Sequence, residues 1–123
     1  MAAYNQLFVY KSCYDLLLML YRDLARLPRD IKYTLLQDLK QDTLMVLRYI
    51  YHANATQDKA TYLEKALEHI LNVKINIRLL WDLRQIKENS YARFLEQAEN
   101  VSKQLTAWHS AAIKKQEKTE KQI

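Results

Sequence analysis

Apolar residues recur at steps of three and four along most of the chain, which is the periodicity of amphipathic helices. The first stretch with this pattern covers residues 4–27. It is expected to end before Pro28, because proline suits the first turn of a helix but disfavours helical geometry in the residue before it. A second helix with a wide apolar face is therefore expected over residues 28–52.

Two more helices are expected in the second half of the chain. Asn54 can adopt the left-handed geometry that glycine usually supplies, and Thr56 can cap the next helix, so residues 53–56 form the second turn. The third helix then ends near residue 86, and the fourth covers residues 91–112. Four helices of similar length with short connections pack most simply as an all-α, up-down-up-down antiparallel four-helix bundle.

Length and composition fit one domain of this kind. A chain of 123 residues, of which 50% are hydrophobic, can build one continuous core, and the lack of glycine argues against hairpins and sheets. The bundle is expected to occupy residues 1–112. Residues 113–123 are polar and highly charged, so a frayed helix end or a disordered tail is expected there.

Basic residues outnumber acidic ones. The net charge is +5, from 19 Lys and Arg against 14 Asp and Glu. Residues 113–123 hold four Lys and two Glu, which leaves 15 basic and 12 acidic residues in the rest of the chain. The positive excess thus belongs to the bundle as well, and it favours anionic partners.

Cysteine usage and hydropathy indicate the compartment. Cys13 is the only cysteine, so no internal disulfide can form, and its apolar neighbours predict a small buried hydrophobe in a reducing environment. No signal-peptide pattern is present, and the longest apolar run, residues 16–21, is too short to cross a bilayer. A cytoplasmic protein without membrane contact is expected.

The sequence lacks a recognisable catalytic or metal-binding pattern. His52, His69 and His109 fall on three different predicted helices, and none has a histidine four residues away. Glu64 and Glu68 do not have the spacing to His69 that a di-iron bundle needs. No catalytic residue, metal or cofactor is therefore expected, and the protein is predicted to be non-enzymatic. An all-helical enzyme with scattered catalytic residues is the alternative.

The strongest candidate site is a basic cluster at the end of the third helix. Lys74 and Arg78 lie four residues apart, so their side chains share a face and could both bind phosphates or acidic groups. Arg84 and Lys87 follow, and only Asp82 offsets the four positive charges. A surface ion pair between Arg78 and Asp82 is the alternative, and spacing alone favours it.

Tyrosine is frequent, with nine copies. Tyr10, Tyr14 and Tyr21 follow one stripe of the first helix, and others cluster around the second turn. Such rings could stack on bases, but they more often lie in cores or interfaces. The apolar faces of the first two helices are wider than a bundle requires, which favours subunit contacts.

The residues of three predicted helices also show a family resemblance. The strongest segment is the ten-residue run Lys-Ile-Asn-Ile-Arg-Leu-Leu-Trp-Asp-Leu at residues 74–83, which has two basic residues four apart and an Asp-Leu pair. Shorter matches are Leu27-Pro28-Arg29, Tyr33-Thr34-Leu35, Ala53-Asn54-Ala55, Tyr91, Phe94-Leu95 and Ala107-Trp108. In their order and spacing these residues resemble the accessory variability determinant proteins of diversity-generating retroelements. One departure is Thr106-Ala107, where that family usually has two glycines.

The resemblance implies a basic four-helix bundle that forms a homopentameric ring. It also implies that the ring binds a reverse transcriptase and its template RNA and supports mutagenic cDNA synthesis and retrohoming. Lys74, Arg78, Arg84 and Lys87 would then contact the partner or nucleic acid. The alternatives are a ribosomal intervening-sequence-type four-helix-bundle protein and a purely structural oligomer.

Overall fold

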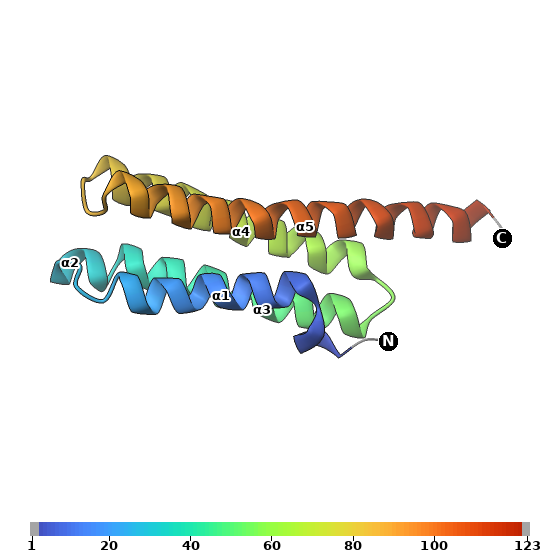
Figure 1. Cartoon of the computed structure of the whole chain (residues 1–123). Helices are drawn as coiled ribbons and strands as arrows, with labels where there is room; N and C mark the ends of the chain where they lie inside the picture. Colours follow the sequence, from blue (N-terminus) through green and yellow to red (C-terminus); the bar gives the residue numbers. More distant parts are fainter. Residues whose placement is uncertain (1–2, 122–123) are drawn as a thin grey trace.

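The structure is a computed structural model that describes residues 3–121. This part of the chain forms helices and no strand. The four long helices pack against one another, as predicted; they are α1 (Phe8–Asp23), α3 (Leu35–Ala55), α4 (Lys59–Asp82) and α5 (Glu88–Lys121). A short 3-10 helix, η1 (Tyr4–Gln6), precedes them, and one helical turn, α2 (Arg29–Lys32), separates α1 from α3. Figure 1 shows that successive long helices run in opposite directions.

Each long helix has two neighbours in the bundle. α1 packs against α3 and α5, and α4 packs against the same two helices. The helices therefore surround the core in the order α1, α3, α4, α5, so that α1 and α4 lie diagonally opposite. Every helix buries one side and leaves the other side free to carry exposed residues.

The core of α3, α4 and α5 consists largely of the apolar positions that the helical periodicity predicts, whereas on α1 the tyrosine stripe is not the buried side. Tyr14 and Tyr21 are exposed, and α1 buries Val9, Cys13, Leu16 and Leu20 instead. Cys13 has no exposed surface, as predicted, and burial raises the pKa of its thiol. Burying a large apolar side chain stabilises the fold by about 1.5 to 3 kcal/mol. The largest fully buried side chains are Phe94, Leu16, Leu20, Leu36, Leu39, Ile50, Leu63, Ile70, Ile77, Leu80, Leu105 and Val46.

The first predicted helix, over residues 4–27, is shorter in the structure. Leu7 has extended backbone angles and separates η1 from α1, which ends at Asp23. Leu24 is buried and Leu27 packs partly against the core. The chain therefore leaves the helix early and turns both leucines towards the bundle.

The prediction of one helix over residues 28–52 is wrong at Thr34. This residue has φ −120° and ψ −84°, which interrupts the helix between α2 and α3. Its hydroxyl donates a hydrogen bond of 2.6 Å to the carbonyl of Asp30. Threonine can offer the backbone such an alternative to the helical bond, and here it marks the break.

The second turn also differs from the prediction. Asn54 lies within α3, which runs through Ala55, so it is helical rather than left-handed, and Thr56 ends α3 instead of capping α4. The Nζ atom of Lys59 donates to the carbonyls of Ala53 and Thr56, both at 2.8 Å. A side chain from α4 thus satisfies carbonyl groups at the end of α3 that would otherwise lack partners.

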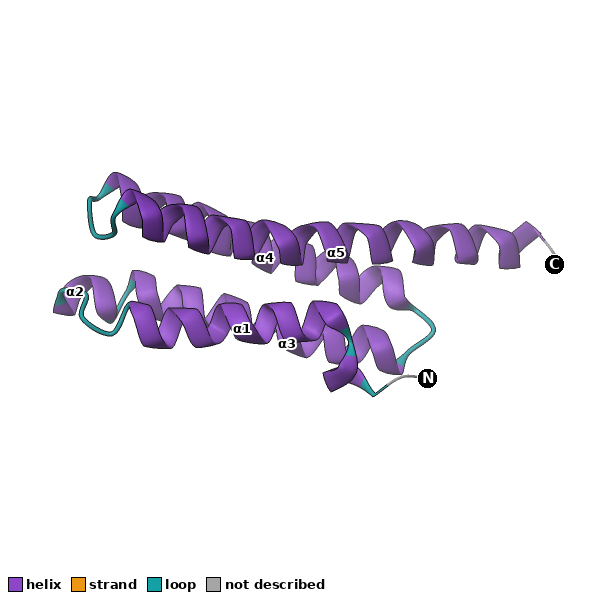
Figure 2. Ribbon diagram, in the orientation of Figure 1, coloured by secondary structure: helices purple, strands orange, loops and turns teal. Residues whose placement is uncertain are grey.

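α5 continues beyond the bundle. It starts at Glu88, before the predicted residue 91, and stays helical through Lys121, where a frayed end or a disordered tail was predicted from residue 113. Figure 2 shows this uninterrupted helix. Its last residues are mainly Lys, Glu and Gln, which favour helix, and Glu117 precedes Lys121 at the spacing of an attractive pair. Residues 122–123 of the predicted tail lie outside the described residues.

The two phenylalanines provide a test of this core. Phe94 is fully buried on α5, whereas Phe8 at the start of α1 is 82% exposed. Phe94→Ala should lower the free energy of unfolding by about 3 to 5 kcal/mol, because it leaves a cavity in the core. Phe8→Ala is the matched control and should change it by about 0.5 kcal/mol or less. Urea titration followed by circular dichroism measures both, and equal effects would contradict the packing of α5.

Candidate functional site

Lys74 joins α4 to α5 rather than extending into solvent. Its Nζ atom lies 3.3 Å from Oε1 of Glu99 and 3.5 Å from the hydroxyl of Ser102, both on α5. The Lys74 side chain is only 23% exposed. Its charge is therefore partly neutralised, and its position is fixed by the neighbouring helix.

Arg78 lies one turn further along α4 and is held by several groups. Its Nε atom donates to both carboxylate oxygens of Asp82, at 3.1 and 3.2 Å. The guanidinium carbon lies 5.2 Å from the centre of the Trp81 ring, which in turn stacks on Tyr91 at 4.2 Å. Hydrogen bonding to Tyr91, and to a smaller extent to Asp82, raises the pKa of Arg78.

Arg78 nonetheless remains accessible. Its side chain is 60% exposed, so the ion pair with Asp82 is an exposed pair and stabilises the fold little. The surface ion pair between Arg78 and Asp82, which their four-residue spacing predicted, is confirmed. The ring of Trp81 and the carboxylate of Asp82 hold the guanidinium in one position at the surface, which lowers the entropic cost of binding a partner there.

Arg84 has a structural role that the sequence did not reveal. Its φ is 58°, the one positive φ outside glycine in the described chain. Its N–H donates to the carbonyl of Trp81 at 2.8 Å, and the N–H of Gln85 donates to the carbonyl of Leu80 at 2.9 Å. These two bonds form the Schellman motif that ends α4, in which the left-handed residue is usually glycine.

Lys87 lies at the other end of the same connection. It is exposed and directly precedes α5, and its carbonyl accepts a hydrogen bond of 2.9 Å from the N–H of Tyr91. The structure thus places Lys74 and Arg78 along the edge between α4 and α5. Arg84 and Lys87 lie in the loop at the end of that edge.

An exposed apolar stripe accompanies these basic residues. Leu71, Ile75, Leu79 and Leu83 follow one another at steps of four, and each is between 41% and 56% exposed. The buried positions of α4, such as Ile70 and Ile77, lie on a different side of the helix. α4 is therefore apolar on two sides, whereas burial in the bundle requires only one.

The sequence contained the signal for this stripe. Its four residues follow one another at a strict four-residue step, whereas the core positions of α4 are separated by steps of both three and four. Leu83, the last residue of the stripe, is the C-cap of α4 and is exposed. We name the residues Leu71, Lys74, Ile75, Arg78, Leu79 and Leu83 the α4 face.

The histidines connect helices. Nδ1 of His69 lies 2.8 Å from Oδ1 of Asp42 on α3. Nε2 of His109 on α5 is buried and lies 3.4 Å from Oε1 of Glu64 on α4, without hydrogen-bond geometry. Among residues 3–121, no three His, Cys, Asp or Glu side chains come together as a metal site. Over the same residues, no helix has both the length and the apolar character needed to cross a membrane.

The chain was also compared with known proteins. No protein-family model matches it, and no curated protein is significantly similar. The α4 face and the other exposed surfaces are therefore the main indications of its function.

The loop after α4 gives a test of the backbone at Arg84. A side chain with a Cβ atom is disfavoured at positive φ, so Arg84→Gly should raise the free energy of unfolding by about 1 kcal/mol. Arg84→Ala keeps the Cβ atom and removes the charge, so it should leave stability near that of the unchanged protein. Urea titration distinguishes them, and a destabilised glycine variant would contradict the left-handed conformation.

Proposed function

We propose that this protein is a non-enzymatic accessory subunit that binds other macromolecules, and that the α4 face is the surface for a protein partner. The observation that carries this proposal is the exposed stripe of Leu71, Ile75, Leu79 and Leu83. Contiguous apolar side chains on the solvent side of a helix are typical of interaction sites, because their burial on binding is favourable. The family resemblance suggests the partner, which is the reverse transcriptase of a diversity-generating retroelement.

The charged border of the α4 face suits such a partner. Arginine is a residue type that is enriched at protein interfaces. Arg78 is already held by Trp81 and Asp82, so its side chain loses little conformational entropy on binding. Lys74 adds a second positive group at the same edge, although Glu99 partly neutralises it. The apolar stripe would then provide affinity, and the basic border would orient the polymerase and its RNA.

The same resemblance supports a role for the complex. The reverse transcriptase would copy its template RNA with errors, and this chain would hold enzyme and nucleic acid together for cDNA synthesis and retrohoming. We place the protein in the cytoplasm, where such an enzyme would meet its RNA. A reverse transcriptase gene beside the gene for this chain would favour this role over a ribosomal intervening-sequence-type protein.

We further propose that the chains assemble into a homopentameric ring. Large apolar side chains are exposed on α1, α3 and α4. Such exposure exceeds the isolated apolar residues that are normal on a monomer. A head-to-tail contact that closes on itself would bury part of this surface and produce a ring.

The ring is tested by multi-angle light scattering of the full chain at micromolar concentration. The measured mass should correspond to about five chains, because a closed ring is one discrete species. A single species with the mass of one chain would rule the ring out. A mixture that grows with concentration would indicate open, head-to-tail association instead.

The α4 face is tested by capture of a candidate reverse transcriptase from a diversity-generating retroelement. Ile75→Gln together with Leu79→Gln removes the centre of the stripe but keeps residues that favour helix. Affinity should fall by a factor of about 30 or more, which is the loss of at least 2 kcal/mol expected at an interface centre. Leu44→Gln changes an exposed leucine on α3 and is the matched control, so its affinity should stay unchanged.

The basic border of the α4 face is tested by replacing its charged residues with uncharged ones rather than with acidic ones. Reversing Lys74 to Glu would place two carboxylates together, because Glu99 lies 3.3 Å from its Nζ atom. Lys74→Gln with Arg78→Gln removes both charges without this repulsion and should also weaken capture. A double variant of the stripe that still folds, assembles and binds the polymerase as tightly as the unchanged protein would exclude the α4 face as the binding surface. Absence of polymerase binding by the unchanged protein would instead favour a purely structural oligomer.

A further inference from the structure

A second exposed surface lies along the edge between α1 and α3. The ring centres of Tyr10 and Tyr14 lie 6.4 Å apart, and their planes differ by only 15°. Tyr4 of η1 contacts Tyr10 at 5.2 Å and Tyr51 of α3 at 4.9 Å, both edge to face. Four tyrosines from three helical elements thus form one continuous group of rings.

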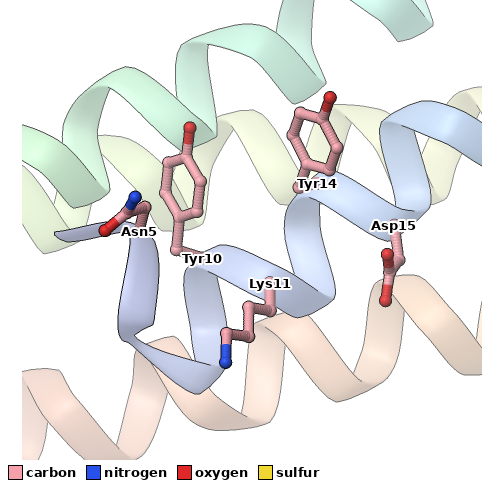
Figure 3. A pocket seen from close by; sticks show the side chains of 5 residues that line it. All are labelled: Asn5, Tyr10, Lys11, Tyr14 and Asp15. Carbon is pink, nitrogen blue, oxygen red and sulfur yellow. The ribbon is translucent and has the colours of Figure 1, made fainter.

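This group extends further along α1. Tyr21 lies seven residues after Tyr14, and two helical turns return it to the same side of α1 at a distance of about 10 Å. Figure 3 shows that the rings of Tyr10 and Tyr14 project from α1 in one direction, whereas Lys11 and Asp15 project in the opposite direction. All four side chains line one shallow pocket. Tyr4, Tyr14, Tyr21 and Tyr51 are between 38% and 56% exposed, so their rings are accessible.

One basic side chain contacts this group of rings, and a second is exposed further along α3. The Nζ atom of Lys40 on α3 lies 4.0 Å from the centre of the Tyr21 ring. Arg48 is exposed on α3 one turn before Tyr51. The carboxylate of Asp42 faces α4, where it contacts His69, so it lies on the other side of α3. Asp38, four residues earlier, shares that side.

We propose that this strip binds single-stranded RNA, with unpaired bases stacked on the exposed tyrosine rings and phosphates near the basic side chains. This proposal rests on the proposed role in binding template RNA and assigns a separate surface to it. We name the strip the α1–α3 seam, and its residues are Tyr4, Tyr10, Tyr14, Tyr21, Lys40, Arg48 and Tyr51.

The composition of the α1–α3 seam favours a single strand over other partners. Aromatic rings beside positive charges are the usual surface for single-stranded nucleic acid, because every base offers a flat face and every nucleotide a negative charge. In a duplex the bases are already stacked on each other and cannot reach the rings. A protein partner would need carboxylates opposite Lys40 and Arg48, whereas RNA supplies phosphates along its whole length.

The seam is tested by fluorescence anisotropy with a labelled RNA of about 16 nucleotides, within the range of known single-strand sites. The full chain should bind the single strand more tightly than the same sequence annealed to its complement. Tyr14→Ala and Tyr51→Ala should each weaken single-strand binding about tenfold, and the two together about a hundredfold, because each removes one stacking ring. Lys40→Gln should make binding less sensitive to salt.

Two further variants separate stacking from other effects. Tyr14→Phe keeps the ring and loses only the hydroxyl, so it should bind RNA as the unchanged chain does. Tyr33→Ala is the matched control, because Tyr33 is 60% exposed but lies in the link between α2 and α3. It should also leave RNA binding unchanged.

Three outcomes would overturn the assignment. Equal binding of single strand and duplex would show phosphate contacts without stacking. Full RNA affinity in the variant with both Tyr14→Ala and Tyr51→Ala would place the RNA elsewhere. A change in the number of associated chains in that variant would identify the seam as a contact between copies. Capture of the polymerase through the α4 face is measured separately, so failure of the seam and failure of the proposed function remain distinguishable.

Discussion

The contact on which the rest of the structure depends is the packing of α1 between α3 and α5. Leu16 and Leu20 of α1 are fully buried, and they close a core that α3, α4 and α5 would otherwise leave open to water. The side-chain amides of Gln97 and Gln104 on α5 donate to the backbone carbonyl and the hydroxyl of Ser12, respectively. These polar bonds lie beside the apolar contact and favour one register of α1 against α5.

This closure decides which residues remain for binding. Because each long helix has only two neighbours, apolar side chains beyond the buried side must lie on the surface. On α4 the result is a stripe of leucine and isoleucine that the bundle does not use. On α1 it is a row of tyrosines next to α3. A sequence selected only for a stable bundle would gain nothing from either surface, since exposed apolar residues favour aggregation.

The helices could be predicted from the sequence because their apolar periodicity is local. Their ends could not, since they depend on particular side chains. The break at Thr34 follows from a hydroxyl that bonds to the backbone, the end of α3 from Lys59 of the next helix, and the end of α4 from a left-handed Arg84. Glycine usually marks such ends, and this chain has none.

The candidate site was only partly predictable for a similar reason. The exposed pair of Arg78 and Asp82 follows from a spacing of four residues, so sequence suffices to find it. The partner of Lys74 is Glu99, which is distant in sequence and comes close only when α4 and α5 pack. Two of the four positive charges in the predicted cluster are thus already paired. A basic motif on one helix therefore indicates the net charge of a surface only after the charges of the neighbouring helix are known. On the α4 face the exposed apolar side chains indicate binding more strongly than the cations do, because both of those cations are already paired with carboxylates.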